Sequence, residues 1–74
     1  MDIYTYLGKH RLTKQKFARS LGITQPVIYR ILNGSRFPKI NVAIKVQQIT
    51  NGEVTVEEFL LGCWKVYKEK WKIR

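Results

Sequence analysis

Side chains capable of acid, base or nucleophilic chemistry are few in this sequence and lie far apart. The 74 residues contain one histidine, His10, one cysteine, Cys63, and five carboxylates. Catalysis by such groups needs a second reactive side chain within hydrogen-bond reach, and no spacing in the chain indicates a pair or triad. One cysteine cannot form an internal disulfide, and with one histidine it cannot complete a metal site. We therefore expect neither an enzyme nor a metal protein, and no cofactor or small-molecule substrate.

The chemistry that the chain does offer is that of its cations. Fourteen Lys and Arg residues oppose five Asp and Glu residues, which gives a formal net charge of +9. Such a surface attracts polyanions, including nucleic acid. Five of the fourteen basic residues fall in the last twelve positions, so the end of the chain is disproportionately basic. Because a high net charge can also serve solubility alone, the inference of a nucleic-acid partner requires a binding motif in addition to the charge.

The length of the chain limits the size of the domain that carries these groups. Seventy-four residues make one domain with one modest core and no room for a deep catalytic cavity. No apolar run approaches the roughly 18 residues of a membrane span, and the segment Met1 to Tyr4 lacks the order of a signal peptide. We expect a cytoplasmic protein, associated with the nucleoid and not with a membrane.

Capping residues and helical spacing predict an all-α fold of five short helices. Asp2 can cap a first helix that reaches about His10, and Thr13 can cap a second that ends at Gly22. Thr24 is the next capping residue, and the third helix after it ends at Asn33 and Gly34.

The second half of the chain continues the helical pattern. A polar loop over residues 35–39 precedes a fourth apolar segment, 42–49, whose glutamines favour a helix over a strand. Thr55 and Glu58 have the spacing of a capping box and open a fifth helix through Leu61. We expect a domain boundary directly afterwards, with a folded domain over 1–62 and a basic aromatic extension over 63–74.

The segment 14–34 has the spacing of two helices that cross at a tight turn. Ala18 supplies a small side chain where the helices meet, and Gly22 tolerates a positive φ in the three-residue turn. Ile28 and Ile31 anchor the second helix of the pair from its inner face. The sequence therefore predicts a helix-turn-helix within a compact bundle.

These landmarks, KQKFARSLGITQPVIYRILNG with SRFP directly after them, resemble the Cro and phage-repressor family of helix-turn-helix proteins, the XRE type. The turn TNGEV and the segment TVEEFL are also similar to the family, so that the resemblance covers nearly the whole chain to Leu61. It implies a lambda-repressor-like bundle of five helices. It also implies a regulator of transcription in a phage or bacterium, expected to be a repressor, that binds an operator in double-stranded DNA.

The outward face of the third helix carries the residues expected to read bases in the major groove. Gln25 can bond the N6 and N7 edge of adenine, and Arg30 the O6 and N7 edge of guanine. Pro26 offers only an apolar contact, such as one to a thymine methyl. Tyr29 can reach a base or a phosphate, or its ring can shield the helix. These four residues form the predicted base-reading set.

Phosphate contacts are expected from helix N-termini and from the loop after the third helix. In the family that the chain resembles, the residue at the position of Lys14 is usually a glutamine, which holds a phosphate and braces the recognition helix. A lysine can keep the first of these roles. The same side chains also suit caps, turns and solvated surfaces. The candidates are Thr13, Lys14, Gln15, Thr24, Asn33, Ser35, Arg36 and Lys39.

In the extension, Trp64, Tyr67 and Trp71 are spaced as one stripe of a helix, and three interpretations stay open. The stripe can pack back on the domain. It can form the contact of a homodimer, as a helix or as a strand within 65–73, because the related family commonly binds two half-sites one DNA turn apart. The extension can also bind phosphate without specificity through its cations, which are Lys65, Lys68, Lys70, Lys72 and Arg74.

The competing function is that of an interaction module, such as an antitoxin, which binds a protein through the extension. Exposed Trp64 and Trp71 in the free protein would favour it. Single-stranded RNA binding would need an aromatic platform, which only the extension could offer.

Overall fold

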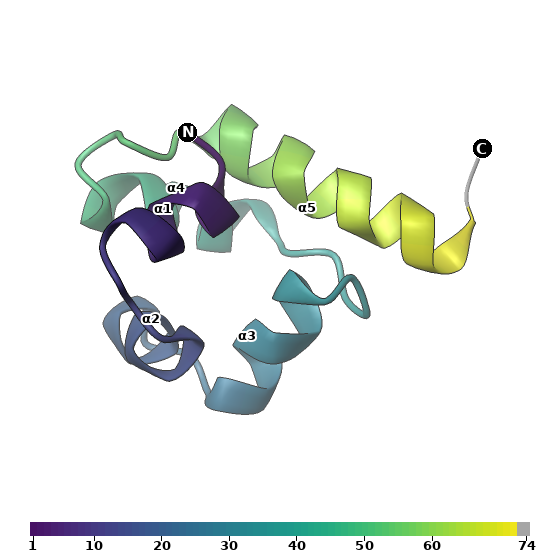
Figure 1. Ribbon diagram of the computed structural model, residues 1–74, viewed down its shortest axis with the longest axis horizontal. Helices are drawn as coiled ribbons and strands as arrows, with labels where there is room; N and C mark the ends of the chain where they lie inside the picture. Colours follow the sequence, from purple (N-terminus) through teal and green to yellow (C-terminus); the bar gives the residue numbers. More distant parts are fainter. Residues whose placement is uncertain (73–74) are drawn as a thin grey trace.

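A computed structural model describes residues 1–72 and contains five α-helices among them. In Figure 1, α2 and α3 form one end of the molecule, opposite α1, α4 and the start of α5, and the second half of α5 extends sideways past the body. No strand occurs within these residues, so the predicted all-α fold of five helices is confirmed. The helices are α1 (Ile3–Lys9), α2 (Lys14–Leu21), α3 (Gln25–Leu32), α4 (Ile40–Ile49) and α5 (Val56–Trp71).

Four of the five helices begin at the capping residues that the sequence indicates, whereas α4 begins after Lys39, which was not among them. The side chains of Asp2 and Thr13 accept hydrogen bonds from backbone N–H groups in the first turns of α1 and α2. Thr55 and Glu58 form the reciprocal capping box at the start of α5. Each of these bonds satisfies an N–H group that a helix start leaves unpaired. Thr24 occupies the N-cap of α3, but its hydroxyl makes no cap hydrogen bond.

One apolar core joins all five helices. Its largest fully buried side chains are Phe17 of α2 and Phe59 of α5. Ile28 and Ile31 bury the inner face of α3 against this core. Since α3 has its apolar stripe fixed inward, its opposite face points to solvent.

α5 is longer than the sequence indicates. The capping pattern predicts a fifth helix that ends near Leu61, whereas α5 runs without interruption to Trp71. A glycine within a helix weakens it by only about 1 kcal/mol relative to alanine, so Gly62 does not end α5. Residues 63–71 are therefore the second half of α5, and the strand considered for 65–73 does not form in their described part.

Two further findings concern residues 1–72 as a whole. None of their helices has the length and apolar content needed to cross a membrane. No three His, Cys, Asp or Glu side chains among them gather closely enough to hold a metal ion.

Three carboxylates near the starts of α1 and α5 have lowered pKa values. Hydrogen bonds from the first turn of α1 lower the pKa of Asp2. A hydrogen bond from the N-terminal ammonium of Met1, 2.7 Å away, lowers the pKa of Glu58. A hydrogen bond from Lys9 lowers the pKa of Glu53. Each of these groups binds its proton more weakly in the folded chain than in the unfolded one.

We expect the protein to lose stability in acid. A lowered folded-state pKa contributes stability that is present above the unfolded value, and this contribution disappears as the pH falls through the folded value. The melting temperature, followed by circular dichroism, should therefore fall between about pH 5 and about pH 2. Asp2→Asn should lower the melting temperature at neutral pH and make the acid limb shallower. A melting temperature that stays constant over this range would contradict the role of the carboxylates.

Candidate nucleic-acid interface

The turn between α2 and α3 fixes how the two helices cross. Gly22 adopts a left-handed conformation with φ of 74°, and its backbone N–H donates to carbonyl groups of the last turn of α2. The N–H of Ile23 donates to the carbonyl of Ala18 at 3.1 Å, which closes the turn. Ala18 is only 2% exposed, so the second helix can approach closely at this point. The three-residue turn predicted from the sequence thus joins α2 to α3.

The exposed face of α3 carries all four of the predicted base-reading residues. Gln25 and Pro26 lie in the first turn of α3, and Tyr29 and Arg30 lie one turn later. All four side chains are exposed, in contrast to the buried stripe on the other side of the helix. This face is referred to below as the α3 face.

A hollow beside α3 brings together predicted phosphate contacts from separate parts of the chain. Thr24, at the start of α3, lines it together with Arg36 and Lys39 from the following loop. Because the Thr24 hydroxyl makes no cap bond, it remains free to bind a ligand. Asn41, in the first turn of α4, lines the same hollow and is not among the residues that sequence reasoning identified. Its place in this hollow follows from the folded chain and not from the residue types.

A second hollow lies between α2 and the first turn of α3. Gln15 and Gln25, both predicted contacts, line it together with Arg19. Sequence reasoning missed Arg19, although it stands four residues after Gln15 and therefore on the same side of α2. The structure thus adds one exposed cation next to the α3 face.

The loop after α3 is tightly hydrogen-bonded. The backbone N–H groups of Ser35 and Arg36 donate to the carbonyl of Arg30 at 2.9 and 3.1 Å. The side-chain oxygen of Asn33 accepts from the Ser35 N–H at 2.9 Å, so this oxygen already serves the turn. Gly34 has a φ of 87° and is buried. Of the predicted loop contacts, Arg36 and Lys39 have exposed side chains, whereas Ser35 is partly buried.

Three side chains link α2 to the α3 face. The Lys14 ammonium lies 5.4 Å from the centroid of the Tyr29 ring, within the range of a cation–π contact. The side-chain amide of Gln25 donates a hydrogen bond to the Tyr29 hydroxyl at 3.0 Å. Lys14 thus contacts α3 through the Tyr29 ring, a contact that the residue types alone do not indicate. Thr13, which caps α2 directly before it, keeps a hydroxyl proton that it can donate.

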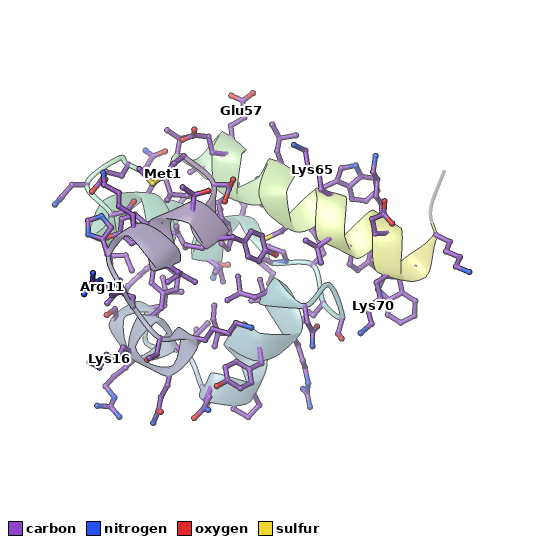
Figure 2. The ribbon with its side chains drawn as sticks, in the orientation of Figure 1. Met1, Arg11, Lys16, Glu57, Lys65 and Lys70 are labelled. Atoms are coloured by element: carbon purple, nitrogen blue, oxygen red, sulfur yellow. The ribbon has the colours of Figure 1, made fainter. Side chains whose placement is uncertain are left out.

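No acidic side chain lies in α2, α3 or the loop that follows α3. Four of the five acidic residues lie near the starts of α1 and α5: Asp2 caps α1, Glu57 and Glu58 lie in the first turn of α5, and Glu53 precedes α5. The ion pairs within residues 1–72 all involve Glu53 or Glu58. Figure 2 shows Glu57 at the upper edge of the molecule and Lys16 at the lower left, on α2. The α2 and α3 end therefore keeps a positive surface. Its cations, with those of the following loop, are Lys14, Lys16, Arg19, Arg30, Arg36 and Lys39.

The aromatic stripe of α5 contacts the loop that follows α3. Phe37 meets Trp64 and Tyr67 edge-on, with ring centroids 6.2 and 5.7 Å apart, and Tyr67 in turn contacts Trp71. The Trp71 indole N–H donates to the Gly34 carbonyl at 3.0 Å. These four rings are called the aromatic cluster below. Sequence reasoning missed Phe37 because it stands alone in a polar loop.

The aromatic cluster packs on the protein and still meets solvent. Trp64 and Phe37 are each 39% exposed, and Trp71 is 54% exposed. The neighbouring cations Lys65, Lys68, Lys70 and Lys72 are exposed as well, whereas Arg74 lies outside the described residues.

Two helices joined by a tight turn, one of which presents a polar face beside a positive surface, define a helix-turn-helix of the DNA-binding kind. Residues 3–57 match the family described as Helix-turn-helix, and the chain belongs to this family, the XRE type of DNA-binding regulators that includes Cro. No curated protein and no solved structure matches the chain.

Proposed function

We propose that the protein is a sequence-specific repressor of transcription that lays α3 in the major groove of double-stranded DNA. The observation that carries this proposal is the α3 face, where polar side chains project between two sets of cations. Arg19 and Gln15 of α2 line one hollow beside α3, and Arg36 and Lys39 line the other. A helix that lies in the major groove needs cations on both sides, because the phosphates of the two DNA strands run along both edges of the groove.

Direct base reading is assigned to three of the four residues of the α3 face, Gln25, Pro26 and Arg30. Arg30 donates to the O6 and N7 of guanine, and Gln25 pairs with the N6 and N7 of adenine. Pro26 contacts a thymine methyl, since its side chain has no polar atom. Tyr29 stands between Gln25 and α2, and its role is developed below.

Phosphate binding is assigned to the two rims of the α3 face. The first turn of α2 supplies Thr13, Lys14 and Gln15, where backbone N–H groups lack intrahelical partners. The second rim is formed by the start of α3 and the loop after it. Its members are Thr24, Asn33, Ser35, Arg36 and Lys39.

We also propose that the operator is bound by a homodimer. One recognition helix contacts only a few base pairs, so related proteins bind two half-sites about 34 Å apart. The aromatic cluster supports a contact between copies, because Trp64 and Trp71 keep large exposed areas. The described chain measures 32 × 23 × 23 Å, which allows two copies to lie side by side over such half-sites.

Trp71→Lys is expected to weaken self-association, because it places a charge in a contact that must exclude water. Sedimentation velocity would measure the change, with Leu61→Lys as the matched control. Leu61 is similarly exposed, at 52%, stands on the same helix and lies outside the aromatic cluster. Equal association constants for the two variants would refute the contact through the aromatic cluster.

Selection from random duplex DNA tests the proposed function directly. The enriched sequence is then titrated against a scrambled duplex at one fixed salt concentration, because affinities for DNA depend steeply on salt. We expect a palindromic site, bound at least about 1,000-fold more tightly than the scramble. Binding without any enriched sequence would contradict operator recognition. The exposed aromatic cluster would then favour an interaction module of the antitoxin kind.

A further inference from the structure

Tyr29 stands at the centre of a chain of contacts that ends on a base-reading side chain. The Lys14 Nζ lies 5.4 Å from the centroid of its ring, and its hydroxyl accepts a hydrogen bond from Gln25 Nε2 at 3.0 Å. Gln25 and Tyr29 are one turn apart on α3, whereas Lys14 is the first residue of α2. The Tyr29 side chain therefore contacts α2 through its ring and the amide of Gln25 through its hydroxyl.

We propose that Tyr29 is a positioning residue that holds the Gln25 amide in place with its carbonyl oxygen free to read adenine. A glutamine amide carries one carbonyl oxygen and two N–H donors. With one N–H bonded to Tyr29, the carbonyl oxygen and the second N–H remain free. This pair matches the N6 donor and the N7 acceptor of adenine.

The contact with Lys14 explains how an exposed ring can hold another side chain. Tyr29 is 42% exposed, so the core alone does not fix its ring. The Lys14 ammonium over the ring face attracts it and keeps it against α2. An exposed glutamine that is already held loses less conformational freedom when it binds, and the correct base gains from this preorganisation.

Tyr29→Phe tests the positioning role, since it keeps the ring beside Lys14 and removes the acceptor for Gln25. This inference rests on the proposed operator reading by α3. We expect the preference for the operator over a variant with guanine in place of the Gln25-read adenine to fall about five-fold, as for the loss of one hydrogen bond of ordinary strength. Competition titration at fixed salt measures the ratio.

A double-mutant cycle separates positioning from direct contact. In the Gln25→Ala background, Tyr29→Phe should cause no further change in the preference, because Tyr29 acts through Gln25. A loss that persists in this background would show that the Tyr29 hydroxyl contacts the DNA itself, and it would overturn the proposal.

Tyr4→Phe is the matched control for removing a hydroxyl near α3. The Tyr4 hydroxyl donates to the Leu32 carbonyl at 2.8 Å, at the other end of this helix. We expect this variant to keep the base preference of the wild type. If it lost the preference as Tyr29→Phe does, a general loosening of α3 would be the cause, and the proposal would be wrong.

A measurement on the free protein distinguishes the failure of this inference from the failure of the proposed function. By NMR, the side-chain amide proton of Gln25 that bonds to Tyr29 should exchange with water more slowly in the wild type than in Tyr29→Phe. Equal exchange rates beside a clear operator would overturn the positioning role alone. Slow exchange without any enriched DNA sequence would overturn operator reading, and with it the role of Tyr29 in base preference.

Discussion

Replacing Arg30 by alanine should weaken binding to the operator by about 1 to 3 kcal/mol, or roughly 5- to 150-fold. The preference at one base position should disappear, since guanine loses its partner there. The fold should not change, because Arg30 is exposed and only its backbone carbonyl holds the following loop. Alanine keeps that carbonyl and is a strong helix former. Titration of the operator and of its three variants at the affected position gives both quantities.

Lys39→Ala provides the matched control, because it removes one exposed cation from the rim of the α3 face. A phosphate contact carries no sequence information, so all duplexes should bind more weakly by a similar factor. The slope of log affinity against log salt should fall by about 1. If Arg30→Ala also weakened every duplex alike, Arg30 would be a phosphate contact and not a base reader.

Gly34→Ala should unfold the protein at a markedly lower temperature. An added Cβ at this position would lie 2.8 Å from the Val66 carbonyl oxygen and 2.9 Å from its Cγ1. The φ of 87° adds backbone strain for any residue with a side chain. Strain and overpacking together should remove about 2 to 4 kcal/mol of stability. For a chain of this size, the melting temperature should fall by more than about 10 °C.

Gly22→Ala is the control for the part of this effect that comes from the backbone alone. Gly22 has a similar φ of 74°, but no atom lies within 4 Å of an added Cβ. It should therefore remove only about 1 to 2 kcal/mol. If the two variants melted at the same temperature, α5 would not pack against Gly34 in solution.

The features of the fold that could be predicted from the sequence depend on interactions between residues close together in the chain. Thr13 and Gly22 define the ends of α2 through interactions within a few residues, and such interactions can be recognised from residue types and spacing. The α3 face follows from the same reasoning, because the buried positions of one helix determine its exposed ones. The identity of its contacts with DNA stays a prediction.

Contacts between distant residues explain what the sequence could not reveal. The cation–π contact of Lys14 with Tyr29 depends on the angle at which α2 and α3 cross. The hydrogen bond from Trp71 to the Gly34 carbonyl joins residues 37 positions apart. The continuation of α5 beyond Gly62 could not be predicted for a related reason. A glycine inside a helix and a glycine that ends one cannot be told apart from the residue type alone.

The hydrogen bond between Trp71 and Gly34 can form only late in the synthesis of the chain, because Trp71 is translated near its end. The helix-turn-helix leaves the ribosome first, and α3 can pack on α2 as soon as both have emerged. The loop after α3 receives its indole partner only when the last turn of α5 has been made. A nascent chain therefore carries α3 before it carries the indole that bonds to the loop after α3, and translation to the last turn of α5 completes this contact.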